Sequence, residues 1–345
     1  MKKYNVAILG ATGAVGAEFL KLIEERNFPF NELRLLASKR SAGKIINFMG
    51  KDYTVQEATH DSFAGIDIAL FAGGSISKEF APSAVKAGAV VIDNSSAFRM
   101  DPEVPLIVPE VNPEAILKHK GIIANPNCST IIMLMALKPI YDLARIKRII
   151  VSTYQAVSGA GKEGIDELTN QVGEYLDGKE MTANILPSAS AEKHYPIAFN
   201  LIPQIDVFCD NLYTKEEMKM VNETRKILDD YDMRITATTI RVHSFPTRRS
   251  SDLVNIELEK DVSLDEIKKA LAAFPGVIVQ DDPAAQLYPM PLYTSDTDEV
   301  YVGRLRRDES APNSFNLWVV GDQIRKGAAL NTLQIAETMI KNGWI

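Results

Sequence analysis

The stretch V-A-I-L-G-A-T-G-A-V-G, residues 6–16, decides the fold. Residues 6–9 are apolar throughout, which is typical of a short strand buried on both faces. Gly10, Gly13 and Gly16 follow directly, and residues 17–25 have the pattern of a helix. A glycine-rich turn between a strand and a helix lets the backbone approach a pyrophosphate, which the helix amino terminus can bind. The spacing is G-x-x-G-x-x-G rather than G-x-G-x-x-G, but the order of elements predicts a dinucleotide site.

The rest of the chain shows two different sequence patterns, each of which predicts a domain. Short apolar runs at 33–37, 67–72, 90–93 and 122–124, separated by helical or loop segments, predict an α/β domain with a Rossmann-type, doubly wound parallel sheet. From residue 149 onward, longer β-branched runs at 149–154, 236–242 and 254–258, with helical patterns at 215–228 and 264–273, predict an α+β domain with an open mixed sheet. We place the first domain at 1–127 with a returning helix at 325–345, and the second at 128–324.

The loop after the second predicted strand indicates which dinucleotide binds. NAD enzymes usually carry an acid here, which accepts a hydrogen bond from the ribose 2′-hydroxyl. This chain instead has Ser38, Lys39, Arg40 and Ser41. Two cations and two hydroxyls suit a 2′-phosphate, so the loop favours NADP over NAD. The alternative is a solvated basic loop with no ligand.

Bulk composition excludes several classes of protein. The formal net charge is -7, which argues against nucleic-acid binding. No apolar run is long enough for a membrane span. The two cysteines, Cys128 and Cys209, are too few for a disulfide framework and fit a reducing cytoplasm. We expect no metal site.

Cys128 is the candidate nucleophile. It follows a predicted strand in N-P-N-C-S-T and opens an apolar helix, and a helix amino terminus favours the thiolate. A nucleophilic thiolate near a nicotinamide predicts a covalent route through a thioester. The alternative is a structural cysteine buried in the core, which is the interpretation kept for Cys209.

Three cations are candidates for binding an anionic substrate. Arg99 follows a predicted strand, and Lys219 lies on a predicted helix one turn after Glu216. Taken individually, Arg99 and Lys219 read as surface charges. Arg241 lies within a strand flanked by apolar residues, and a buried arginine needs a partner or a ligand.

Taken together, these segments resemble the bacterial aspartate-semialdehyde dehydrogenase family. The matching motifs run in family order over residues 10–331: GATGAVG, SKRSAGK, GGSIS, NSSAFRMD, VPEVNP, NPNCST, TYQAVSGAGK, TKEEMKM, IRV, VNIE and VVGDQIRKGAALN. The resemblance implies reversible, NADP-dependent reduction of aspartyl phosphate to aspartate semialdehyde, which feeds lysine, threonine and methionine synthesis. It also implies a homodimer or homotetramer.

The resemblance also implies roles for individual residues. Cys128 forms the acyl intermediate and Gln155 orients the substrate. Arg241 binds the substrate carboxylate, Glu216 its amino group, and Arg99 and Lys219 the phosphate. The implied NADP contacts are Gly10, Thr12, Gly13, Ala14, Val15, Gly16, Ser38, Arg40, Ser41, Ser158, Gly159 and Gln323.

One segment departs from the family. There, the arginine strand continues as R-V-P-V-x-x-G-H-S-E-x-V-N-I-E, and its histidine is the acid–base partner of the cysteine. Here residues 243–253 read H-S-F-P-T-R-R-S-S-D-L, about two residues longer, and Arg248 is seventh after Arg241. The segment matches a translated sequencing-library adapter, and it places a proline and two arginines in a predicted strand, against strand propensity. Two alternatives to the main hypothesis stay open. One is a reductase for another acyl phosphate, such as N-acetylglutamyl phosphate. The other, which follows from the missing histidine, is a catalytically dead NADP-binding protein.

Overall fold

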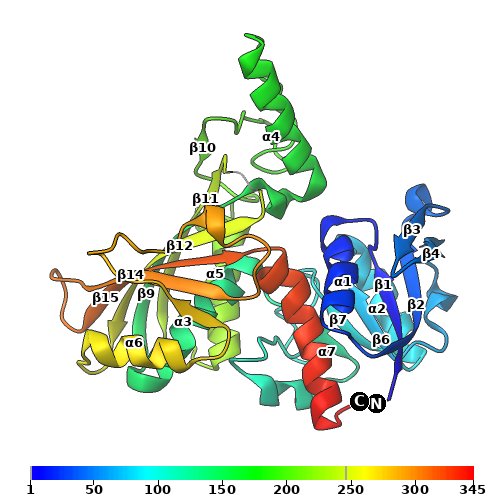
Figure 1. The fold of residues 1–345 in the computed structure, drawn as a ribbon, viewed down its shortest axis with the longest axis horizontal. Coiled ribbons are helices and arrows are strands. Elements are labelled where there is room, and N and C mark those ends of the chain that lie inside the picture. The colour runs from blue at the N-terminus through cyan, green and yellow to red at the C-terminus, as the bar shows by residue number, and fades with distance from the viewer. Residues whose placement is uncertain (1, 245–246) are drawn as a thin grey trace. The chain divides into compact units, whose positions relative to one another are not determined.

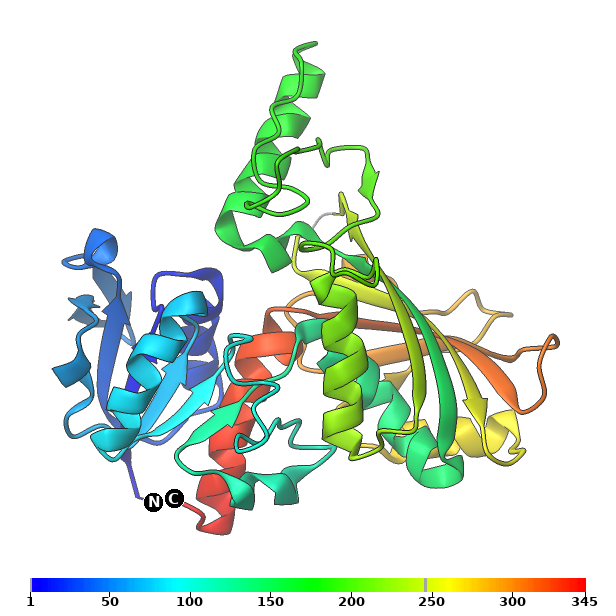
Figure 2. The ribbon, with the colours of Figure 1, turned by 180° about the vertical axis from the view of Figure 1, so that it is seen from behind.

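The computed structural model describes residues 2–244 and 247–345. It divides the chain into two compact units, Met1–Asn127 with Ala328–Ile345 (unit 1) and Cys128–Gly327 (unit 2). Figure 1 and Figure 2 show the ribbon of both units from opposite sides.

Unit 1 is built on a parallel sheet with the strand order β5-β2-β1-β6-β7-β8. Its strands are β1 (Tyr4–Leu9), β2 (Phe30–Ala37), β5 (Gln56–Glu57), β6 (Ile68–Phe71), β7 (Val90–Asp93) and β8 (Ile122–Ala124), with a separate hairpin of β3 (Ile45–Phe48) and β4 (Lys51–Thr54). Its α-helices are α1 (Ala14–Glu25), α2 (Ser77–Lys86) and α7 (Leu330–Asn342).

Alternate side chains of β1 enter two different cores. Val6 and Ile8 pack in a cluster that also contains residues of α1 and α7, whereas Ala7 and Leu9 pack in a second cluster with residues of α2. The sheet is therefore buried on both faces, which explains the unbroken apolar run at 6–9. The returning helix α7 contacts α1 and β7 of this unit.

Unit 2 contains a seven-stranded mixed sheet with the order β10-β11-β9-β12-β15-β14-β13. Its strands are β9 (Ile146–Gln155), β10 (Leu201–Ile202), β11 (Arg234–Val242), β12 (Arg249–Leu258), β13 (Val277–Val279), β14 (Val300–Arg307) and β15 (Ser314–Asp322). Its α-helices are α3 (Cys128–Ala144), α4 (Gly161–Leu176), α5 (Lys215–Leu228) and α6 (Leu264–Ala273). The predicted fold class is confirmed: a parallel doubly wound sheet in one unit and a mixed sheet in the other.

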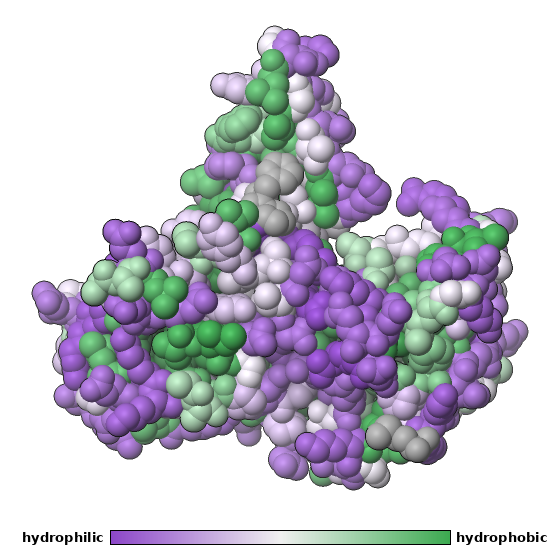
Figure 3. All heavy atoms as spheres, in the orientation of Figure 1, coloured by the Kyte–Doolittle hydropathy of each residue, from purple (hydrophilic) through white to green (hydrophobic). Residues whose placement is uncertain are grey.

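The two faces of the unit 2 sheet differ. Helices α3, α5 and α6 contact the strands and one another on one face, and Figure 2 shows α5 lying along the strands. On the other face, Tyr154 and Trp318 are half-buried with ring centroids 5.8 Å apart, and Leu253 is 38% exposed. Figure 3 shows hydrophobic residues gathered over these strands. Among the described residues, no helix is long and apolar enough to cross a membrane.

Candidate active site

The glycine-rich turn of unit 1 has two kinds of glycine. A Cβ on Gly10 would lie 2.7 Å from the Ala72 carbonyl oxygen, and one on Gly16 would lie 2.3 Å from the Gly10 carbonyl oxygen. Packing therefore excludes side chains at both positions. Gly13, which precedes α1 as its N-cap, would meet only the Gly10 carbonyl oxygen, at an ordinary 3.4 Å. Its missing side chain is not demanded by packing and leaves room for a ligand beside the helix start.

The remaining predicted cofactor residues of unit 1 lie near the carboxyl ends of β1 and β2. Thr12 is exposed in the turn, and Ala14 and Val15 open α1. After β2, Ser38 precedes a short 3-10 turn formed by Lys39, Arg40 and the buried Ser41. The two cations are exposed and form no ion pair with another described residue. Their charge is therefore available to an anion.

Arg99 also belongs to unit 1, and reading it as a surface charge was wrong. It is only 8% exposed. Its Nε donates to the Asn125 carbonyl oxygen at 2.9 Å and its Nη2 to the Asn94 carbonyl oxygen at 2.8 Å. The guanidinium is therefore held by the backbone segments that follow β7 and β8.

Cys128 is the first residue of α3, as the sequence predicted, and it is partly exposed. Gly327 packs directly behind it: a Cβ on Gly327 would lie 2.8 Å from the Cys128 Cβ and 3.2 Å from its Cα. Gly327 lies within a π-helical turn at Arg325–Ala329, a feature that often marks functional sites. Sequence reasoning did not single out Gly327, because only tertiary packing brings it to the cysteine.

Three predicted residues form one polar chain in unit 2. Gln155, at the end of β9, donates from Nε2 to Glu216 Oε1 at 3.3 Å. Glu216 Oε2 accepts from Lys219 Nζ at 3.0 Å. The capping box of Thr214 and Glu217 fixes the first turn of α5, on which Glu216 lies. Burial works to lower the pKa of Lys219, but Glu216 and a second carboxylate, Asp206, outweigh it and raise that pKa.

Arg241 lies near the end of β11 and is 3% exposed. Its Nη1 donates to the Ala156 carbonyl oxygen at 2.6 Å, whereas its Nε has no hydrogen-bond partner among the described residues. Burial lowers the pKa of Arg241, and the charges of Glu216 and Cys128 act in the opposite direction. The charges of Arg241, Glu216 and Cys128 therefore lie close enough to one another to interact.

The other predicted cofactor contacts of unit 2 surround the turn after β9. Gln323 Nε2 donates to the Ala156 carbonyl oxygen at 3.0 Å and to the Ser158 hydroxyl. A Cβ on Gly159 would lie 2.8 Å from Nη1 of Arg241. Ser158, Gly159 and Gln323 thus form one cluster with Arg241.

The segment that departs from the family is built into the central sheet. The strand expected at 254–258 is β12, which starts five residues earlier, at Arg249, and pairs with both β9 and β15. The expectation that the arginines would not suit a strand was wrong for Arg249, because a full ladder on both sides overrides local propensity. Phe245 and Pro246 lie outside the described residues.

The ladder also changes which residue replaces the family histidine. Val254 pairs with Val151 and Leu317, and Ser250 pairs with Gln155 and Gly321. Counting back from Val254 in H-S-E-x-V places Ser250, not Arg248, at the histidine position. The additional residues therefore fall before β12. Arg248 instead forms ion pairs with Asp296 and Asp322, at 2.9 and 3.2 Å.

Asp252 is the one acidic residue in the sequence of this segment. It is fully buried, and its Oδ2 has no hydrogen-bond partner among the described residues. Burial raises its pKa to about 8, although a hydrogen bond from the Ser250 hydroxyl, at 3.4 Å, works against the shift. A carboxyl in this environment holds its proton at neutral pH.

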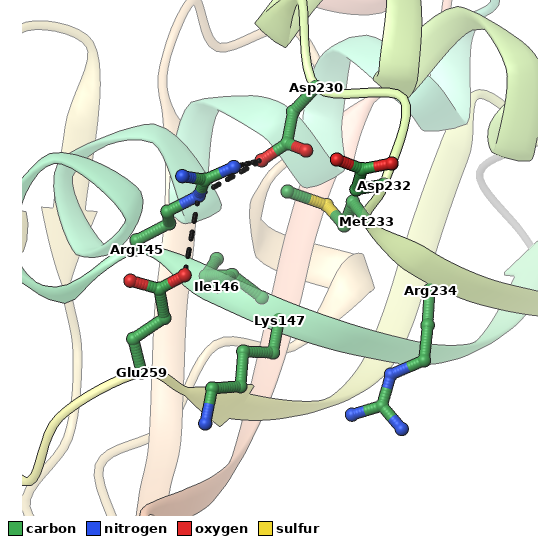
Figure 4. A pocket seen from close by; sticks show the side chains of 8 residues that line it. All are labelled: Arg145, Ile146, Lys147, Asp230, Asp232, Met233, Arg234 and Glu259. Atoms are coloured by element: carbon green, nitrogen blue, oxygen red, sulfur yellow. Dashed lines mark hydrogen bonds and ion pairs between the residues drawn. The ribbon is translucent and has the colours of Figure 1, made fainter.

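A separate hollow of about 180 Å³ lies at the other end of β9 and contains none of the predicted residues. Figure 4 shows Arg145 reaching from one wall to Asp230 and Glu259. The Arg145 to Asp230 pair is 3.1 Å long, and the Asp230 side chain is 4% exposed. Because these charges are paired with one another, we assign the hollow a structural role: its ion pairs connect the start of β9 to the turn after α5.

The family models that match this chain cover both units. Residues 5–119 match the semialdehyde dehydrogenase NAD binding domain, and residues 137–326 match the semialdehyde dehydrogenase dimerisation domain. The chain is 56% identical over 346 residues to aspartate-semialdehyde dehydrogenase of Aquifex aeolicus, with 99% of each protein covered. It is 53% identical to the Bacillus subtilis protein, with 98% of this chain and 97% of the relative covered.

The chain belongs to the aspartate-semialdehyde dehydrogenase family.

The solved structures agree with this membership. Aspartate semialdehyde dehydrogenase II of Vibrio cholerae superimposes with a TM-score of 0.93 at 47% identity, with 99% of both chains covered. A second structure of that enzyme, with the same TM-score and coverage, is described as a complex with ASA. The predicted enzyme class and function, reached from ordered motifs, are confirmed.

Proposed function

We propose that Cys128 is the nucleophile of this aspartate-semialdehyde dehydrogenase, and that unit 2 supplies the substrate site. The observation that carries the proposal is the chain of hydrogen bonds Gln155–Glu216–Lys219 together with the buried Arg241, which lies close enough to Glu216 and Cys128 for their charges to interact. An arginine for a carboxylate, a glutamate for an ammonium and a cysteine for an aldehyde match an amino-acid semialdehyde group by group.

Each side chain then has one task. The thiolate of Cys128 attacks the aldehyde carbon, with Gln155 orienting the substrate, and a thioester remains once the adduct has lost a hydride, which NADP would accept. Phosphate attacks that thioester and releases aspartyl phosphate, while Lys219 and Arg99 balance the charge of the phosphate. In the biosynthetic direction the same steps run in reverse.

We propose NADP as the cofactor, which supplies hydride transfer when bound. The residues present fit it: Gly13 leaves space at the start of α1, and Lys39 and Arg40 have no ion-pair partner among the described residues. Thr12, Ala14, Val15 and the hydroxyls of Ser38 and Ser41 would complete the contacts in unit 1, with Ser158, Gly159 and Gln323 in unit 2. An enzyme of this name from Candida albicans, which shares 24% identity, has been solved with NADP.

The two units would then serve as the cofactor domain and the catalytic and dimerisation domain. We propose that the chain self-associates as a homodimer or homotetramer through the sheet face that carries Tyr154 and Trp318, which lies opposite the face that α3, α5 and α6 cover. Two free cysteines suit a cytoplasmic protein.

We also propose that residues 243–253 do not come from the natural gene. The support is the adapter match together with the serine that the segment places at the histidine position. The chain as written would then bind its ligands but lack the acid–base group. Sequencing the source DNA across these codons tests this directly, and finding the printed codons there would contradict it.

The assay for the function itself is phosphate-dependent NADPH formation from aspartate semialdehyde. In a chain that carries the family pattern P-V-x-x-G-H-S-E-x in place of residues 243–253, we expect activity that requires phosphate and is lost in Cys128→Ser. A reductase for N-acetylglutamyl phosphate would not favour Glu216, because an acylated amine carries no charge. Turnover of N-acetylglutamate semialdehyde in preference to aspartate semialdehyde would therefore reject the proposed substrate site.

A further inference from the structure

Lys219 has a second carboxylate partner that none of the assigned roles explains. Asp206 lies in the segment between β10 and α5, and its Oδ2 lies 3.1 Å from Lys219 Nζ. The two side chains are 32% and 26% exposed, so the pair is partly shielded from water. Lys219 therefore lies between two carboxylates, Asp206 and Glu216, at nearly equal distances.

Contacts within its own loop hold the Asp206 carboxylate in position, independently of Lys219. Its backbone is left-handed, with φ of +69°, a region that aspartate tolerates better than most residues. Its Oδ1 accepts from the Val207 amide at 2.8 Å, and its carbonyl oxygen accepts from Gln204 Nε2 at 3.0 Å. One carboxylate oxygen is thus used by the loop itself, and the other is left to Lys219.

This arrangement bears on how Glu216 can take a ligand. Glu216 is 6% exposed, and both of its oxygens are engaged, Oε1 by Gln155 and Oε2 by Lys219. A substrate ammonium that approaches Glu216 competes with the Lys219 ammonium for Oε2. If Glu216 were the only partner of Lys219, that competition would cost a partly buried ion pair.

We propose that Asp206 is a positioning residue. It keeps Lys219 in place when the substrate ammonium replaces Lys219 as the partner of Glu216 Oε2. Lys219 then stays in the site, and its charge remains available to phosphate. The inference rests on the proposed roles of Glu216 and Lys219, and it adds Asp206 as the group that lets one carboxylate serve two cations in turn.

The test compares Asp206→Asn with Asp210→Asn, which removes the same charge from an exposed position in the same segment. Asparagine tolerates the left-handed backbone and can keep the hydrogen bond to Val207, so the loop should survive. Calorimetry measures Kd for L-2-aminobutyrate, which has the ammonium and carboxylate but no aldehyde, and for butyrate, which lacks the ammonium. The chain as written suffices, because no turnover is needed.

Asp206→Asn should weaken L-2-aminobutyrate about fivefold, the equivalent of about 1 kcal/mol for a partly exposed ion pair, and leave butyrate unchanged. Inorganic phosphate should bind more tightly, because one negative charge beside Lys219 is gone. In a Lys219→Met background the effect of Asp206→Asn on L-2-aminobutyrate should vanish, since the competing ammonium is absent.

Equal weakening of both acids, or an effect that persists in Lys219→Met, would show a structural role for Asp206 and overturn the inference. So would an Asp206→Asn variant that behaves like Asp210→Asn. If the parent chain binds butyrate as tightly as L-2-aminobutyrate, Glu216 does not receive an ammonium. That result would reject the proposed substrate site itself, and the inference with it.

Discussion

Asp252→Asn should remove a large pH dependence from the stability of unit 2. Asp252 is fully buried in β12 between β9 and β15, and burial raises its pKa in the folded chain to about 8, from an ordinary value of 3.8. The folded state therefore binds the Asp252 proton more tightly than the unfolded state does. Between about pH 4 and pH 8 the unfolded state loses this proton while the folded state keeps it, so the free energy of unfolding falls as pH rises.

The size of the effect follows from the shift. Below pH 4 both states are protonated and the group costs nothing electrostatically. From pH 5 to pH 8, three units at 1.36 kcal/mol each give a loss of about 4 kcal/mol, after which the curve levels off because both states are ionised. Asparagine has the same shape and no titration, and its amide can donate to the Ser250 hydroxyl.

The assay is urea unfolding at pH 5, 7 and 9 of the parent chain and Asp252→Asn, both with Trp344→Phe, so that the fluorescence followed is that of Trp318 in unit 2. The stability difference should grow by about 4 kcal/mol from pH 5 to pH 9 in favour of the variant. Asp265→Asn, at an exposed position of α6, controls for net charge and should track the parent. Parallel pH curves for the parent and Asp252→Asn would refute the idea that this carboxyl keeps its proton.

Three further outcomes are expected. NADP should bind at least about tenfold more tightly than NAD, and Arg40→Asp should shift the preference toward NAD in a fluorescence titration; equal affinities in the parent would contradict the role of this loop. Replacing residues 243–253 with the family pattern P-V-x-x-G-H-S-E-x should raise turnover at least about a hundredfold, since neither a guanidinium nor a serine hydroxyl titrates near neutral pH; equal turnover would mean that another group, such as His243, moves the proton. Gly327→Ala should slow both turnover and iodoacetamide labelling of Cys128, because the new Cβ would lie 2.8 Å from the cysteine Cβ; unchanged labelling would show that the π-turn does not position the thiol.

Some helices and strands could be predicted from the sequence because residues within a few positions of their ends determine where they begin and end. The strand β7 and the helices α5 and α6 have the predicted bounds, since a buried strand between turns, and a Thr or Ser cap before an amphipathic run, are signals within a few residues. The helix start at Cys128 is of the same kind. The helix α4 and the strands β13–β15 were not predicted, although β14 pairs with β15 and α4 contacts the turn at Val157–Ala160 that directly precedes it.

The sequence by itself determined the class of chemistry: the glycine turn, the loop at Ser38–Ser41, the thiol at a helix start and the order of the motifs are all properties of short segments. Only the tertiary structure decided which residues meet. The β12 ladder assigns Ser250 rather than Arg248 to the histidine position, because hydrogen-bond register on two neighbouring strands, not residue counting from Arg241, fixes where a strand residue lies. Contacts of Lys219 with Asp206, and of Cys128 with Gly327, join residues whose separation along the chain carries no signal, so no pattern could have found them.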